Sequence, residues 1–220
     1  MPRQPYLPAY EDRSYVVGAL VMKDRDDLMA VIGKIIALWS HADNEIATLF
    51  SLLMGTESDA ALAVFLTLRR ASNQREALTA AAQFKLNGED LRIFNALMRV
   101  YGSLEAERNM LAHSCFGRCD EDPSLLYCIE IKHNVHFIVE TLSREARGDV
   151  SKDRHARLKG HLYVYRKADL DKIYADMESF WWAAFYFNGY LRNPIDIGRL
   201  AEREKLKEYP IIKAAIDAEL

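Results

Sequence analysis

The chain has 220 residues, half of them apolar, so it is long enough to bury a sizeable core as one large domain. Its 29 lysines and arginines are nearly balanced by 32 acidic residues. The resulting formal charge of -3 excludes a global basic field for nucleic acid or membranes, and any polyanion must bind at a local basic patch.

No segment has the composition of a secretion signal or a membrane span. The N-terminus contains acidic residues and three prolines where a signal needs an apolar run. The most apolar stretch, Phe180 to Tyr190, is far shorter than the roughly 20 residues of a membrane helix. The three cysteines form an odd, sparse set that suits reduced thiols. We expect a cytoplasmic protein without membrane association.

Helical periodicity dominates the first half of the chain. Apolar residues from Leu28 to Leu53 recur every three or four positions, which predicts a helix of about 28 residues. Acidic residues around Asp27 favour its start, and Gly55 favours its end. Three more helices are expected over residues 58–70, 74–85 and 91–114.

The start of the third of these helices carries a capping signal and a group of arginines. Asn73 followed by Glu76 has the spacing of a capping box, which predicts that the helix begins directly after Asn73. Arg69, Arg70 and Arg75 surround this point. Two interpretations stay open for them, a solvated helix end and a patch that contacts RNA phosphates.

The pattern changes after residue 114. Two short β-rich runs, at 125–131 and 161–165, predict a pair of strands. Residues 135–142 could extend this sheet. The charged segment 143–160 lacks an apolar face and contains glycines, which is typical of an exposed loop.

A strongly apolar helix is expected over residues 169–191. Its core-facing stripe consists of Leu170, Ile173, Met177, Phe180, Trp181 and Ala184. Four aromatic residues widen this stripe: Trp182, Phe185, Tyr186 and Tyr190. Little polar surface remains, so the helix is either deeply buried or partly covered by another subunit. A polar helical tail follows.

The end of the fourth helix combines residues that can carry chemistry. Four polar side chains lie within an arc of about 140° on that helix: Glu105, Arg108, Asn109 and His113. An arginine offers a permanent cation and a planar fork of donors for phosphate oxygens, and a histidine exchanges a proton near neutral pH. RNA phosphodiester cleavage needs both functions, a cation that binds the phosphate and a group that transfers protons.

The segment Arg108 to His113 resembles the signature of the HEPN ribonucleases, in which arginine and a polar residue precede a histidine after a short gap. The setting is also similar, with a long first helix carrying Trp39 and Glu45. A second, looser match from Arg154 to His161 lacks the helical setting, and we discount it. The resemblance implies a mainly α fold, a HEPN-like helical bundle with a small β-hairpin or short sheet inserted before the last long helix.

The expected domain covers residues 1–220. Its parts are an N-terminal arm (1–24), a helical core ending in the motif (25–113), strands with an exposed loop (114–168), the aromatic helix (169–192) and a helical tail (193–220).

The resemblance implies metal-independent RNA cleavage, in which the ribose 2′-hydroxyl attacks the adjacent phosphate and leaves a 2′,3′-cyclic phosphate. His113 would act as general base or acid, and Arg108 would hold the scissile phosphate. Asn109 would orient the histidine or a phosphate oxygen. Glu105 and Glu45 are candidates for supporting these residues, and for Glu45 the alternative is a carboxylate that faces solvent. No cofactor or metal is expected.

The resemblance also implies partners. One motif supplies a single histidine, whereas sites of this family typically combine two motifs across a twofold interface, so we expect a homodimer with both His113 side chains facing one cleft. The substrate would be RNA, the setting toxin-antitoxin or phage defence, and an antitoxin protein a further partner.

Other interpretations stay open. His113 could simply cap its helix, and Arg108 could pair with Glu105. The chain could keep the HEPN shape and bind RNA, a nucleotide or a protein without cleaving, or serve as a plain scaffold. A zinc site of His113 and the cysteines lacks a CxxC pair and is disfavoured. His133 and His136 are expected on the surface.

Overall fold

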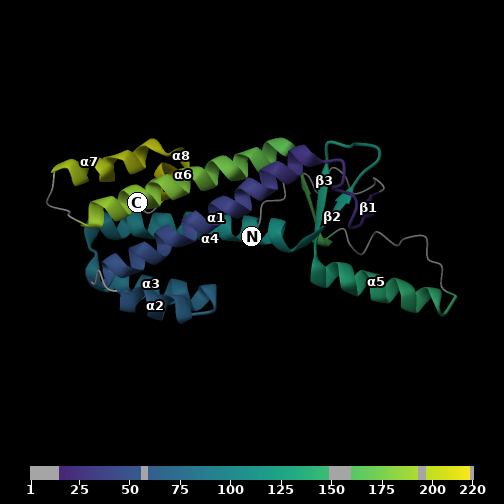
Figure 1. Cartoon of the computed structure of the whole chain (residues 1–220), viewed down its shortest axis with the longest axis horizontal. Helices are drawn as coiled ribbons and strands as arrows, with labels where there is room; N and C mark the ends of the chain where they lie inside the picture. Colours follow the sequence, from purple (N-terminus) through teal and green to yellow (C-terminus); the bar gives the residue numbers. More distant parts are fainter. Residues whose placement is uncertain (1–14, 56–58, 149–159, 193–196, 219–220) are drawn as a thin grey trace. The chain divides into compact units, whose positions relative to one another are not determined.

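A computed structural model describes residues 15–55, 59–148, 160–192 and 197–218. Within these ranges the fold is mainly helical with a small four-stranded antiparallel sheet, which confirms the coarse fold prediction (Figure 1). The chain forms two compact units, and each boundary falls inside a long helix. The sheet unit comprises the described parts of Met1–Ile36 and Glu105–Tyr174, and the helical unit those of Ala37–Leu104 and Ala175–Leu220. The single domain stays a prediction.

The elements of Figure 1 follow in chain order. They are β1 (Val16–Val17), α1 (Asp26–Leu53), α2 (Asp59–Thr67), α3 (Ala71–Lys85), α4 (Gly88–His113), β2 (Ser114–Arg118), β3 (Leu126–Glu130), α5 (Ile131–Glu145), β4 (Leu162–Tyr165), α6 (Lys167–Arg192), α7 (Ile197–Lys205), a 3-10 turn (Leu206–Glu208) and α8 (Pro210–Asp217). No helix in the described ranges is both long and apolar enough to cross a membrane.

The long helices predicted from the apolar periodicity are confirmed. Helix α1 has 28 residues, starts with Asp26 and Asp27, and is followed by Gly55 with φ of 69°, a left-handed conformation that ends helices. Helix α6 extends the prediction by two residues at its start and one at its end. The polar tail is helical as well.

Aromatic packing forms much of the core of the helical unit. The Trp39 ring stacks on Tyr101 at 4.9 Å between centroids, and Tyr101 packs against Phe180 at 5.6 Å. Tyr101 Oη also donates to Asp43 at 2.8 Å. Trp181 is only half-buried, so its expected core position is wrong, because it lies about 100° around the helix from the fully buried Phe180.

Helix α3 begins earlier than the capping pattern indicated. Arg70 has extended backbone (φ −99°, ψ 128°) and precedes the helix, and Gln74 N donates to its carbonyl at 3.1 Å. Asn73 therefore lies inside the first turn, and the prediction that it caps the helix is wrong. Helix α2 also ends at Thr67, before the arginines.

The sheet has the order β1-β2-β3-β4, with every neighbouring pair antiparallel. The predicted pairing of residues near 125–131 with those near 161–165 is confirmed as β3 with β4. Strands β1 and β2 were not predicted. Leu125, Ile129 and Val164 are fully buried and form the centre of the core of the sheet unit.

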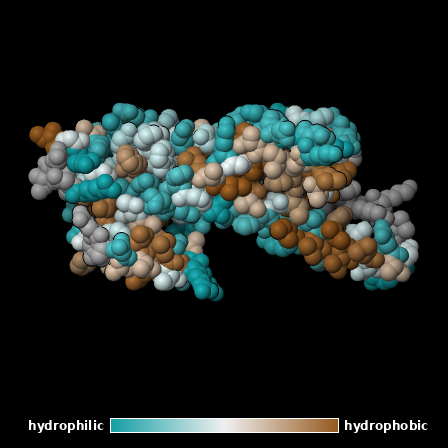
Figure 2. All heavy atoms as spheres, viewed as in Figure 1, coloured by the Kyte–Doolittle hydropathy of each residue, from teal (hydrophilic) through white to brown (hydrophobic). Residues whose placement is uncertain are grey.

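Residues 135–142 form a helix, so the prediction that they extend the sheet is wrong. They belong to α5, whose apolar residues recur every three or four positions: Ile131, Val135, Ile138, Val139 and Leu142. The four β-branched residues among them, two isoleucines and two valines, favour strands, but the spacing of all five fits a helix. All five are 45% to 60% exposed, and Figure 2 shows them as a brown band at the lower right.

The expected exposed loop begins later than predicted, because residues 143–145 still belong to α5. Arg147 and its neighbours are exposed, while 149–159 lie outside the described residues.

Candidate active site

The chain runs directly from the motif helix into the sheet. His113 is the last residue of α4, and Ser114 is the first of β2. Ser114 pairs with Glu130, the last residue of β3, and Ile131 opens α5. Neighbouring strands are about 4.8 Å apart. The end of α4 and the start of α5 therefore lie side by side at one end of the sheet.

A cavity of about 430 Å³ opens at this junction. Its walls are Ala106, Asn109, Met110 and His113 from α4, Glu130 from β3, and Ile131 and Lys132 from α5. His113 is exposed and Asn109 is half-buried. The structure thus brings two predicted site residues together with two charged residues that the sequence did not single out.

Arg108 reaches this cavity through its neighbour. Its Nη1 donates to Asn109 Oδ1 at 2.8 Å, and its own side chain is not among the described residues lining the cavity. Because the arginine holds the amide oxygen, the amide nitrogen of Asn109 is the end left for donation elsewhere. Glu105 is half-buried one turn earlier.

Glu130 and Lys132 add an ion pair to the cavity wall. Lys132 Nζ lies 2.6 Å from Glu130 Oε2, with 68% and 35% of the two side chains exposed. The Lys132 hydrogen bond, followed by the charges of Lys132, His133 and His161, lowers the pKa of Glu130. A carboxylate and an ammonium group therefore line the same cavity as His113.

Two further imidazoles flank this ion pair. His133, in the first turn of α5, stacks on His161 just before β4, with ring centroids 3.6 Å apart and planes tilted by 10°. Partial burial first, and then the charges of His161 and Lys132, lower the pKa of His133. His136 is exposed as predicted, whereas His133 is half-buried.

The turn of α4 that carries Arg108, called the motif turn below, is anchored to the sheet by a buried hydrogen bond. Tyr165, in β4, donates through Oη to Glu107 Oε2 at 3.4 Å, and the two residues are 1% and 3% exposed. Burial, and next the charge of Glu107, raises the pKa of Tyr165. This contact ties α4 to β4 just before Arg108.

The remaining predicted residues lie in the helical unit. Glu45 accepts a hydrogen bond from the buried Asn188 Nδ2 at 2.8 Å, so its carboxylate is not simply facing solvent, and its support of the motif stays a prediction. Arg69 and Arg70 are exposed. Arg75 is half-buried and lines a shallow groove along α3.

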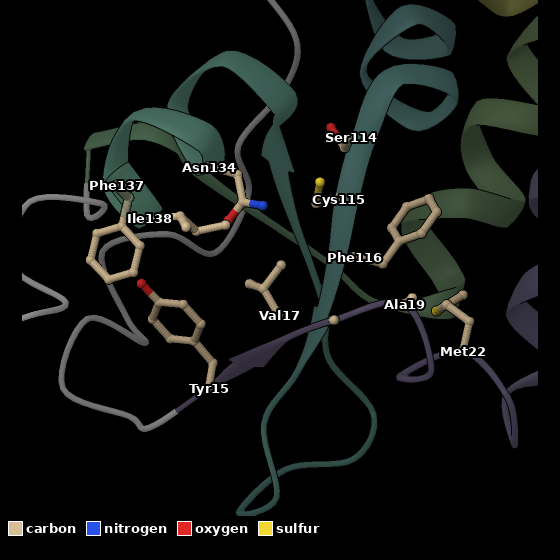
Figure 3. A pocket seen from close by; sticks show the side chains of 11 residues that line it. Tyr15, Val17, Ala19, Met22, Ser114, Cys115, Phe116, Asn134, Phe137 and Ile138 are labelled. Carbon is tan, nitrogen blue, oxygen red and sulfur yellow. The ribbon is translucent and has the colours of Figure 1, made fainter. Parts of the chain in front are cut away.

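A second cavity, of about 500 Å³, lies between β1, β2 and α5 (Figure 3). Its apolar lining comes from Tyr15, Val17, Met22, Phe116, Phe137 and Ile138. Ser114, Cys115 and Asn134 add polar atoms, and in Figure 3 the amide of Asn134 points inward. The cavity pairs no nucleophile with a base among the described residues, so it offers shape and apolar surface rather than chemistry.

The cysteines are free thiols. Cys119 and Cys128 are buried, and burial raises the pKa of Cys128. In the described part of the chain no group of three or more metal-ligating side chains is gathered.

Glu130 and Lys132 were not singled out because they have no motif of their own, and only the strand register brings the end of β3 and the start of α5 to the end of α4. His161 closes the looser match that we discounted for lack of a helical setting, and the register of β4 places it at the same end of the sheet.

No protein-family model, no curated protein and no solved structure matches the chain. The resemblance to HEPN ribonucleases therefore depends on the segment Arg108 to His113 and its helical setting. Function has to be inferred from the chemistry of this chain's own residues.

Proposed function

We propose that the chain is a metal-independent endoribonuclease of the HEPN type. The observation that carries this proposal is that His113, a titratable group, is exposed in an open cavity beside Asn109, whose amide is held by Arg108. A sealed imidazole could not reach RNA. The cavity volume of about 430 Å³ suits part of a nucleotide.

The reaction is transesterification. His113 accepts the proton of the ribose 2′-hydroxyl, the 2′-oxygen attacks phosphorus, and the bond from phosphorus to the 5′-oxygen breaks. Negative charge grows on the phosphoryl oxygens. Arg108 and Lys132 supply nearby cations, and the amide nitrogen of Asn109 supplies a donor for those oxygens. The product ends in a 2′,3′-cyclic phosphate.

The departing 5′-oxygen needs a proton. The family resemblance assigns this step to His113 of a second copy in a homodimer. It also suggests a cytoplasmic role in toxin-antitoxin or phage defence, with an antitoxin as regulator. The exposed Arg69 and Arg70, with Arg75, are candidates for contacts with more distant RNA phosphates.

The direct test is cleavage of RNA in EDTA by wild type, His113→Ala and the control His136→Ala. His113→Ala should lose about 100-fold or more in rate, the usual contribution of a general base, and His136→Ala should keep wild-type rate because it replaces an exposed imidazole outside the cavity lining. The 3′ ends should be cyclic phosphates. Equal cleavage by wild type and His113→Ala rejects the assignment.

A second candidate function is a HEPN-like module that binds RNA, a nucleotide or a protein without cleaving it. The observation favouring it is that Arg108 is not among the described residues lining the cavity. In the same assay this candidate predicts RNA retained by the wild type and no cyclic product at any time.

A further inference from the structure

The end of the sheet that holds His113 also holds a second imidazole from the same chain. Ser114 of β2 pairs with Glu130 of β3, and Leu162 of β4 pairs with Ile129. His113 directly precedes Ser114, and His161 directly precedes Leu162. The two histidines therefore lie at the same end of the sheet, each directly before one of the two strands that flank β3.

The distance across this end suits a phosphodiester. Strands β2 and β4 are separated by two strand spacings, or about 10 Å. General acid–base catalysis at one phosphate needs hydrogen bonds of about 2.8 Å to the attacking and the leaving oxygen, which places the two ring nitrogens about 6 to 9 Å apart. His161 is not among the described residues that line the cavity, but both side chains are exposed, and imidazoles attached about 10 Å apart can be brought into this range by rotation of their side chains.

Glu130 lies between the positions of His113 and His161 at this end of the sheet. Its side chain lines the cavity that His113 also lines. It also lies close enough to His133 and His161 for their charges to act on its carboxylate. The Glu130 carboxylate therefore interacts electrostatically with His161 and lines the cavity that His113 also lines.

His161 stacks on His133, with ring centroids 3.6 Å apart. Partial burial first, and then the charges of His161 and Lys132, lower the pKa of His133. His161 is the exposed member of the stack, so its ring is the one that a substrate can reach. The lone pairs lie in the ring planes, so stacked rings do not converge on one metal ion.

We infer that His161 of the same chain, rather than His113 of a second copy, is the general acid of the proposed ribonuclease. This inference rests on the proposed function. His113 takes the 2′-hydroxyl proton while the bond from the 2′-oxygen to phosphorus forms. His161 gives its proton to the 5′-oxygen as the bond from phosphorus to that oxygen breaks. The two histidines then return to their starting states by exchange with water.

The test compares two substrates that differ in their leaving group, an RNA dinucleotide and a nucleoside 3′-(4-nitrophenyl phosphate). A nitrophenolate departs without a proton, so it does not need a general acid. His161→Ala should lose about 100-fold or more on the dinucleotide and under about 10-fold on the aryl ester. His113→Ala should lose activity on both. Equal losses for His161→Ala on both substrates, or none on either, overturn the inference.

Two controls distinguish the loss of a general acid from misfolding and from a site shared between two chains. Because His161 is exposed, His161→Ala and His161→Gln should keep wild-type circular dichroism and thermal midpoint. A mixture of His113→Ala and His161→Ala should stay inactive if both groups come from one chain, and recovery of activity overturns that claim. Absence of cleavage of either substrate by the wild type rejects the proposed ribonuclease and this inference together, whereas the losses above concern the inference alone.

Discussion

The contact that anchors the motif turn can be tested by removing one hydroxyl group. Tyr165→Phe deletes the donor to Glu107 and keeps the ring in place, so no cavity forms. Tyr165 is 1% exposed and Glu107 is 3% exposed, so water cannot replace the lost donor.

The expected loss follows from the geometry of this hydrogen bond. A bond to a charged acceptor contributes about 1.5 to 3 kcal/mol, and a donor–acceptor distance of 3.4 Å is long, so about 1 to 2 kcal/mol is expected for Tyr165→Phe. For a chain of 220 residues this corresponds to a fall in thermal midpoint of about 2 to 8 °C.

Alkaline pH gives a second measure of the same contact. The raised pKa of Tyr165 means that, above about pH 10, the unfolded chain loses this proton while the folded chain keeps it. The free energy of unfolding of the wild type should therefore fall as pH rises above about 10. Tyr165→Phe lacks this group, so the difference between the two proteins should shrink there.

Urea unfolding of wild type, Tyr165→Phe and Tyr163→Phe, at pH 8 and above pH 10, measures both effects. Tyr163 lies on the same strand and is half-buried, so loss of its hydroxyl should change the free energy of unfolding by less than about 0.5 kcal/mol. Equal stability of Tyr165→Phe and wild type at pH 8, or an unchanged difference at high pH, would refute the argument.

Two further predictions concern the sheet unit. Burial, and next the charge of Tyr127, raises the pKa of Tyr15 to about 12, so stability from this group is present below about pH 10 and lost as pH rises toward 12. In the absorbance titration of Tyr15→Phe, one tyrosine fewer should ionise near pH 12 than in the wild type. An unchanged titration curve would contradict this. Gly117→Ala should cost about 1 to 3 kcal/mol in urea unfolding, because its new Cβ would lie 3.0 Å from Val16 O. Gly18→Ala, with its nearest atom at 4.0 Å, is the matched control and should be neutral.

The sequence by itself determined the long helices and the motif. Helices α1 and α6 are visible because the apolar spacing of one helix face depends only on residues within a few turns. For the same reason the position of Asn109 and His113 on one face follows from helix geometry. The hydrogen bond of Arg108 to Asn109 was not predicted, because neighbouring residues do not face each other on a helix.

Helix α5 marks the limit of local signals. The conformational preference of its isoleucines and valines indicates a strand, while their spacing indicates a helix. Over only 15 residues these two signals do not decide the structure. Tertiary structure decided this competition. The buried strands β3 and β4 already pair with each other, and the chain turns into a helix directly after Glu130.

Only the tertiary structure decided what surrounds His113. Glu130 and Lys132 meet the motif, and His161 comes to the same end of the sheet, through strand register, which depends on how distant segments bury their apolar faces together. No local spacing encodes that register. The imidazole and the helix that carries it could thus be predicted from the chain, whereas the charged wall of its cavity and the position of His161 at the same end of the sheet became visible only after folding.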